Sequence, residues 1–264
     1  MGTANALVRI GFKLGLVYRF DFFIGMIRIP LTLLIYYFLW KSIYAYTGTG
    51  LINRFTFTGL ITYYVISMIV GIFAYSSVDE WMEEEVVDGE VVSEVLRPVS
   101  YIARHFYVER GFMLLALFLE AIPAVLIAVI FFNLFLPSMT NGIAFAFSVI
   151  FASILIFLLT FIVGMSAFWL KKIQGMRRVK RAVVAFLDGT LLPLTFFPIW
   201  AQAIANYLPF QHMRFVPVNI YLGKYTLIEV GKMLAIQCLW IIVLFVLAIV
   251  VWKQAYKRIV GVGT

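Results

Sequence analysis

The chain has 264 residues, of which 64% are hydrophobic and only 13% are charged, and its mean hydropathy is +1.01. A soluble domain of this length cannot bury so much apolar surface, which excludes the soluble classes and indicates an integral membrane protein. The formal net charge is +8, and the single cysteine, Cys238, excludes an internal disulfide and a thiolate metal site.

The first expected element is a short amphipathic helix ahead of the membrane spans. Its apolar face has helical spacing and consists of Leu7, Ile10, Leu14 and Val17. Arg9 and Lys13 lie roughly opposite, which suits a helix resting in the anionic cytoplasmic interface. The alternative is a simple basic lead-in to the first span.

A membrane-spanning helix needs about 20 mostly apolar residues. Five stretches satisfy this requirement, namely 22–40, 55–77, 111–132, 143–170 and 233–252. Clustered Pro, Asn and Gly predict a turn over 133–142. The stretch 182–199 is weaker because it contains Asp188 and two prolines, and we count it as the fifth of six spans. The expected fold is a single all-α transmembrane domain over 1–264.

The stretch 200–224 is semi-apolar and is interrupted by Pro209 and Pro217. It is too irregular for another full crossing. Irregular backbone at membrane depth requires protein or water around it, so we expect a re-entrant or interfacial helical element between spans five and six. An ordinary surface loop is the alternative.

Basic residues set the expected orientation. With six spans, 16 of the 21 Lys and Arg residues fall on one side, including Lys171 and the five basic residues that follow it up to Arg181. The five on the other side are Lys41, Arg54, Arg214, Lys224 and Lys232. The positive-inside rule then predicts a multi-pass protein with both termini in the cytoplasm.

Motifs for chemistry are absent from the sequence. His105 and His212 are isolated and no zinc spacing is present, so no metal is predicted. Gly223 and Lys224 lack the remainder of a P-loop, so the chain itself is not expected to hydrolyse ATP. Nucleic acid is not an expected partner, whereas membrane lipids are.

Two acidic residues fall inside predicted spans. Glu120 lies about ten residues into the third span, where a charged group costs roughly 2.5–3.5 kcal/mol. It either lines a translocation path or hydrogen-bonds across a helix interface. Asp188 is a polar hinge or a carboxyl near the end of its span, and both readings stay open.

The acidic residues are concentrated in one stretch of an otherwise basic protein. Eight of the 13 Asp and Glu residues lie between Asp79 and Glu94, around the sequence EEEVVDGEVVSEVLRP. This stretch, DFFIGMI before it and LLPLTFFPIWAQAIANYLPFQHMRFVPVNIYLGK near the C-terminus resemble the small six-span permeases of type-2 ATP-binding cassette (ABC) exporters. The resemblance covers essentially the whole chain, although the triple Glu is more acidic than is usual there.

The resemblance implies a cytoplasmic coupling loop over about 79–105 that docks on a separate ABC ATPase. Gly89 would end the preceding helix, 90–96 would form a coupling helix, and Arg97 with Pro98 would end it. The predicted ATPase contacts are Gly89, Glu90, Val91, Val92, Val95, Leu96, Arg97 and Pro98. Paired valines and Leu96 would supply the apolar contact, and the surrounding acids would complement a basic rim on the ATPase. A solvated loop that docks nothing is the alternative.

The resemblance also implies an extracellular gate over about 193–224. The predicted gate residues are Pro193, Phe197, Pro198, Leu208, Pro209 and Phe210. ATP and Mg²⁺ would bind only in the partner ATPase, so this chain needs no cofactor. A second six-span permease, either a paralogue or a copy of this chain, would complete the path in a bacterial cytoplasmic (inner) membrane. A hydrophobic or amphipathic cargo suits such spans; a passive channel and a lipid-modifying intramembrane enzyme are the alternative functions.

Overall fold

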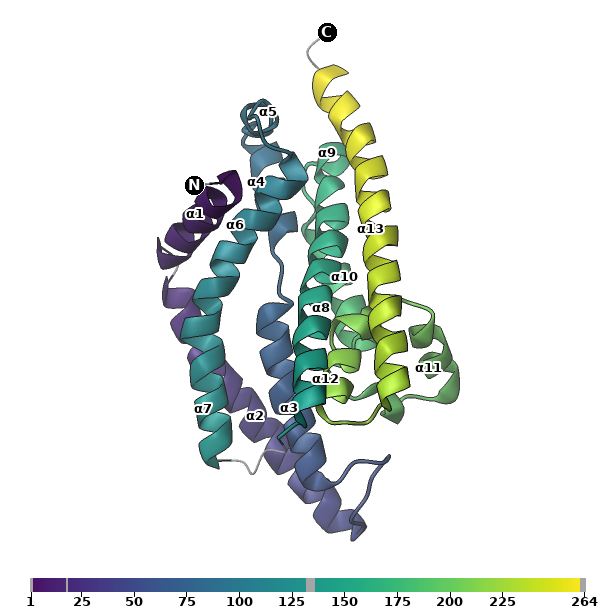
Figure 1. The fold of residues 1–264 in the computed structure, drawn as a ribbon. Helices are drawn as coiled ribbons and strands as arrows, with labels where there is room; N and C mark the ends of the chain where they lie inside the picture. The colour runs from purple at the N-terminus through teal and green to yellow at the C-terminus, as the bar shows by residue number, and fades with distance from the viewer. Residues whose placement is uncertain (1, 18, 132–135, 262–264) are drawn as a thin grey trace.

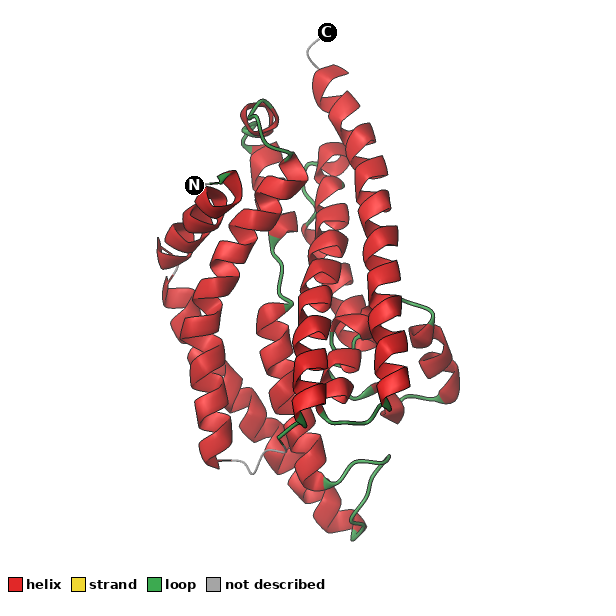
Figure 2. Ribbon diagram, in the orientation of Figure 1, coloured by secondary structure: helices red, strands yellow, loops and turns green. Residues whose placement is uncertain are grey.

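The computed structural model describes residues 2–17, 19–131 and 136–261. This part of the chain is helical (Figure 2), and its only strand-like pairing is an isolated bridge between Ile52 and Phe55. The helices are, in order, α1 Thr3–Val17, α2 Arg19–Thr47, α3 Phe57–Phe73, α4 Val78–Val87, α5 Val91–Val95, α6 Tyr101–Ala116, η1 Leu117–Ala121, α7 Ile122–Phe131, α8 Met139–Met165, α9 Ala167–Leu170, α10 Gln174–Leu187, η2 Leu194–Phe196, α11 Ile199–Asn206, η3 Phe210–Met213, α12 Phe215–Tyr221 and α13 Leu227–Gly261. The predicted all-α class is confirmed.

Within the described residues, five helical stretches are long and apolar enough to cross a membrane. They are Ile24–Thr47, Phe57–Val87, Tyr101–Phe131, Met139–Leu170 and Leu227–Arg258, and each overlaps one of the stronger predicted spans. The weaker span over 182–199 is wrong as a continuous helix, because α10 ends at Leu187. Gly189 follows with a φ of +85°, a left-handed conformation that glycine adopts readily. The predicted turn over 133–142 begins in 132–135, outside the described residues.

Between α8 and α13 the chain nevertheless has to return from one end of the molecule toward the other. Figure 1 shows the start of α1, α5, α9 and the end of α13 at one end, while α3, α8 and α13 begin toward the other. Between α8 and α13 the chain runs back through α10, η2, α11, η3 and α12. This return consists of short helices instead of one long helix.

Two of the long helices are interrupted. The turn over residues 74–77 separates α3 from α4, and the backbone N–H of Ser77 donates to the buried Glu109 carboxylate at 3.0 Å. The helix that begins with α6 changes to a π-helix at η1, just before Pro123. Proline has no N–H to donate, so a change of hydrogen-bond register before it is physically reasonable. A π-helical segment is often found at a functional site.

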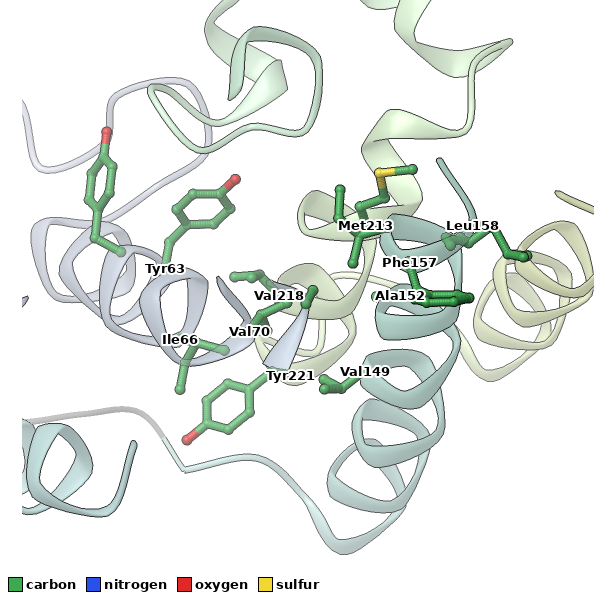
Figure 3. Close-up of a cluster of buried hydrophobic side chains, with 14 of the residues drawn as sticks. Tyr63, Ile66, Val70, Val149, Ala152, Phe157, Leu158, Met213, Val218 and Tyr221 are labelled. Atoms are coloured by element: carbon green, nitrogen blue, oxygen red, sulfur yellow. The ribbon is translucent and has the colours of Figure 1, made fainter. Parts of the chain in front are cut away.

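The core lies where α3 and α8 enclose α12. Figure 3 shows Val70 of α3, Val149 of α8 and Val218 of α12 pointing toward one another. Every residue of α12 from Val216 to Tyr221 is buried, so this part of the 200–224 stretch is not the exposed loop that was one of its two predicted forms. By contrast, α11 carries the exposed side chains of Ile199 and Trp200.

The N-terminal helix packs across α6. The two helices cross at glycines: a Cβ added at Gly11 would overlap the carbonyl of Val108, and one added at Gly111 would overlap the carbonyl of Val8. Three residues of the predicted apolar face, Ile10, Leu14 and Val17, are exposed. Ile10 and Val17 are accessible at the surface, Leu14 also lines the cavity described below, and the position of α1 in the membrane interface stays a prediction.

Candidate coupling segment and internal cavity

The segment between α4 and α6 contains the short helix that the sequence predicted. Gly89, with a φ of +77°, follows the last turn of α4, and the N–H of Asp88 donates to the Glu84 carbonyl at 2.9 Å. The helix α5 spans Val91–Val95, inside the predicted range 90–96, and the chain then turns through Pro98 into α6. A glycine in left-handed conformation after a helix is a common helix end.

The two apolar pairs on α5 have different surroundings. Val91 is only 7% exposed, and Val95 is half-buried against the core. Val92 and Leu96 instead are 52% and 80% exposed. Only the second pair is available to another chain, so the predicted contact surface is narrower than the four residues suggested.

Ion pairs fix α5 to the adjoining helices. The buried carboxylate of Glu94 pairs with Arg97 at 2.9 Å and with Arg104 of α6. Arg104 also lies 3.3 Å from Glu85 of α4. Glu94 thus connects α5 to the start of α6, and Arg104 extends this connection to α4.

The same network reaches the last helix. The Tyr101 hydroxyl donates to Glu85 at 2.5 Å, and His105 Nε2 lies 3.3 Å from the same carboxylate. The Tyr101 ring stacks on Trp252 of α13, with centroids 4.5 Å apart and an interplanar angle of 6°. These contacts therefore connect α5 to α4 and, through Glu85 and Tyr101, to α13.

Three other acids of α4 pair with basic residues of α10. Arg177 lies 2.8 Å from Glu80 and 3.0 Å from Glu83, and Lys180 Nζ lies 2.6 Å from Asp79. These acids bind basic residues of their own chain, as do Glu85 and Glu94. Charge complementarity between the acidic stretch and a basic rim on the ATPase stays a prediction, and these intramolecular pairs reduce the charge that the stretch can offer. Within the acidic stretch 79–94, the exposed acids with no ion pair to a described residue are Glu84, Asp88 and Glu90.

A cavity of about 1130 Å³ lies between α1 and α2 on one side and α3, α4 and α6 on the other. It extends from the α4–α5 end, where Asp88 and Glu90 line it, to Glu120 in η1. Its lining mixes apolar side chains with charged groups from both ends of this path.

Glu120 lies in the cavity lining and beside α2, and its role in a translocation path stays a prediction. Its carboxylate lines the cavity, and it also faces α2, because a Cβ added at Gly25 would overlap it. Arg28, one turn further along α2, is close enough to attract it electrostatically. No hydrogen bond or ion pair joins Glu120 to a described residue, so its carboxylate is available to a molecule in the cavity.

Asp188 is paired with a residue that sequence reasoning assigned to an external loop. Its carboxylate lies 3.2 Å from Arg214 Nε, and Arg214 donates to the Ser67 carbonyl of α3 at 3.0 Å. The Thr190 N–H and hydroxyl donate to Asp188 at 2.8 and 2.5 Å. Arg214 is therefore held inside the protein, which corrects its placement among the external basic residues. A buried acid in a predicted span needs a partner; sequence reasoning had this signal but did not name Arg214 as that partner.

The six predicted gate residues flank α11. Pro193 is buried before η2, while Phe197 and Pro198 directly precede α11, and the Phe197 ring contacts Phe186 with centroids 4.7 Å apart. Leu208, Pro209 and Phe210 follow α11 and lead into η3. The structure thus places the predicted gate residues at the two ends of α11.

The family model described as ABC-2 family transporter protein matches residues 30–263. The chain belongs to this family. Comparison with curated proteins and with solved structures found no match. As a member of the ABC-2 family, the protein is a permease component of an ABC transporter. Such a component is not itself catalytic and implies association with an ABC ATPase.

Several charged groups of this ABC-2 permease join helices. Glu94 and Arg104 do so at α5, and Asp188 and Arg214 do so beside α12. Among its described residues, no group of three or more His, Cys, Asp or Glu side chains is arranged to hold a metal ion.

Proposed function

We propose that this chain is the permease subunit of an ATP-driven exporter and that it docks on a separate ATPase through α5. The observation that carries the proposal is the contrast within α5. Val91 and the ion-paired Glu94 fix the helix to the permease, while Val92 and Leu96 remain exposed beside Arg97. A helix fixed on one face and apolar on the other is suited to transmit a partner's movement.

The proposed topology has six crossings, with both termini and α5 on the cytoplasmic side of a bacterial inner membrane. It is supported by the shared position of these elements at one end of the molecule and by the excess of basic residues in their loops. The sixth crossing is the return from α10 to α12. A reporter fused after Gln174 should report the cytoplasm, whereas a fusion after Gly50 should report the outside. An external signal after Gln174 would contradict this topology.

A second permease, either a copy of this chain or a paralogue, completes the proposed path. The support comes from α10, in which no residue is buried. Its apolar side chains Met176, Val179, Val183 and Phe186 recur at helical spacing and are exposed. Contact with a neighbouring permease would cover this stripe, and ATP and Mg²⁺ would bind in the ATPase.

The test shortens the two exposed apolar side chains of the segment between α4 and α6, Val92 and Leu96. Val92→Ala/Leu96→Ala should still insert and purify as a monodisperse protein, because both side chains lie outside the core. Loss of two apolar contacts at the centre of a small interface can cost about 2–4 kcal/mol. We therefore expect reduced copurification with a candidate ABC ATPase from an adjacent gene, and loss of cargo-stimulated ATP hydrolysis in reconstituted membranes.

The matched control is Leu191→Ala/Ile199→Ala. These side chains are 50% and 86% exposed, close to the values for Val92 and Leu96, but they lie away from α5. The control should retain ATPase binding. Equal binding by both double variants would show that α5 is a solvated connector. Conductance without ATP would instead indicate a channel, and turnover of a lipid by the purified chain would indicate an enzyme.

A further inference from the structure

The internal cavity is large enough for an amphiphilic small molecule. Its volume of about 1130 Å³ is slightly above the roughly 300–1,000 Å³ typical of small-molecule sites. Part of its wall is aromatic: Phe22 of α2 lies in the lining with Trp81 and Phe112, whose ring centroids are 5.1 Å apart. Apolar and aromatic walls of this kind accommodate the body of a hydrophobic ligand.

The charge of the lining is opposite to the charge of the chain. The protein has a formal net charge of +8, yet acids outnumber bases around this cavity. Glu84, Asp88 and Glu90 line its α4–α5 end and make no ion pair with a described residue. Glu120 places a fourth such carboxylate deeper in the cavity.

The bases of the lining are mostly neutralised. Arg104 pairs with Glu85 and Glu94, and Arg214 pairs with Asp188. Arg28 is the remaining lining base, and it has no ion pair to a described residue. Unpaired acids therefore outnumber unpaired bases, so the cavity attracts cations from its α4–α5 end inward.

We propose that the cavity binds organic cations with a bulky apolar body and that such amphiphilic cations are the cargo class. The carboxylates would attract the cation toward Glu120, and the aromatic wall would hold the apolar body, aided by the attraction between a cation and an aromatic face. The positive charge of Arg28, near Glu120, opposes this attraction. Neutralising Glu120 and neutralising Arg28 should therefore have opposite effects on cation binding. The assignment as cargo rests on the proposed export function, whereas binding does not.

The test uses two ions of nearly the same size and shape and of opposite charge, tetraphenylphosphonium and tetraphenylborate. Binding is measured by equilibrium dialysis on the purified full-length permease, without any ATPase, as the saturable fraction above detergent alone. We expect saturable binding of tetraphenylphosphonium and none of tetraphenylborate. Glu120→Gln should weaken cation binding about tenfold, which corresponds to 1.4 kcal/mol, and Arg28→Gln should strengthen it severalfold.

Two further variants keep the test decisive. Glu229→Gln removes an acid at the start of α13 that is not in the lining, and it should leave binding unchanged. If Glu120→Gln does not fold, the triple variant Glu84→Gln/Asp88→Gln/Glu90→Gln, whose positions are exposed, should weaken binding. Saturable tetraphenylborate binding as tight as that of the cation would overturn the proposal, as would cation binding that neither acidic variant changes.

The outcome is separable from the export proposal. If α5 proves not to dock on an ATPase, cation binding by the isolated permease still tests the cavity. If ATPase coupling through α5 is normal and the cation does not bind, the cargo class alone is overturned.

Discussion

The α4–α5–α6 end and the buried region around α12 both use ion pairs, but in opposite settings. At the first, several carboxylates and bases fix a short helix whose outer face stays exposed, as Glu94 and Leu96 illustrate. At the second, the pair of Asp188 and Arg214 lies beside α12, in which Val216 to Tyr221 are buried. The first arrangement leaves the outer face of α5 accessible. The second stabilises the core where the chain returns through the short helices from α10 to α12.

The largest expected effect comes from breaking the buried pair. Asp188→Asn should destabilise the protein by about 3–5 kcal/mol, because Arg214 would lose its counter-charge inside the protein. The measurement is the thermal unfolding midpoint in detergent, together with the yield of monodisperse protein. In a double-mutant cycle with Arg214→Gln, the combined loss should be well below the sum of the two single losses. Additive and small losses would show that the pair does not stabilise the α12 region.

A smaller and more local effect is expected at α5. Glu94→Gln removes the charge that Arg97 and Arg104 share, and hydrogen bonds to charged groups contribute about 1.5–3 kcal/mol each. Hydrogen exchange should accelerate over residues 88–100 and remain slow in α3. The control Glu90→Gln, at an exposed acid without an ion pair, should change neither region. Faster exchange in α3 after Glu94→Gln would mean that the two regions are not independent.

The smallest expected effect is a difference in stability between variants at two adjacent acids of α4, Glu83 and Glu84. Glu83→Gln should weaken the attachment of α10 by up to about 1 kcal/mol, since Arg177 keeps only Glu80 as a partner. Glu84→Gln should leave stability unchanged, because Glu84 makes no ion pair with a described residue. Denaturant unfolding at low and high salt should show a salt-sensitive difference for Glu83 only. Equal effects would indicate a general charge effect instead of a specific contact.

The sequence predicted α5 well because its signals are local. Gly89 and Pro98 bound a stretch of alternating valines and acids, so the helix and its end are set by residues close together in the chain. The side that α5 exposes was not predictable, because it depends on Arg104 and on the packing of Val95 against the core formed by distant helices. The cavity was missed for the same reason: its walls come from α1, α2, α3, α4, α6 and η1, which are distant in sequence.

The segment from α10 to α12, in which the chain returns between α8 and α13, was predicted least well. A window of apolar residues over 182–199 resembles a span, but Gly189 ends the helix, and the chain is then held by contacts with residues far away in sequence. The Tyr63 hydroxyl donates to the Gly189 carbonyl at 2.8 Å, and Asp188 pairs with Arg214. Hydropathy reports on composition along the chain and contains no information on such pairs.

Site-specific photo-cross-linking from α5 tests the central claim most directly. Benzoylphenylalanine would replace Leu96, which is exposed, and in a separate variant Tyr207, which is exposed just after α11 and away from α5. Both variants would be reconstituted with the candidate ATPase and irradiated. The account predicts a product of one permease and one ATPase chain from position 96 and none from position 207. An assembled, ATP-hydrolysing complex that gives no ATPase cross-link from position 96 would contradict it.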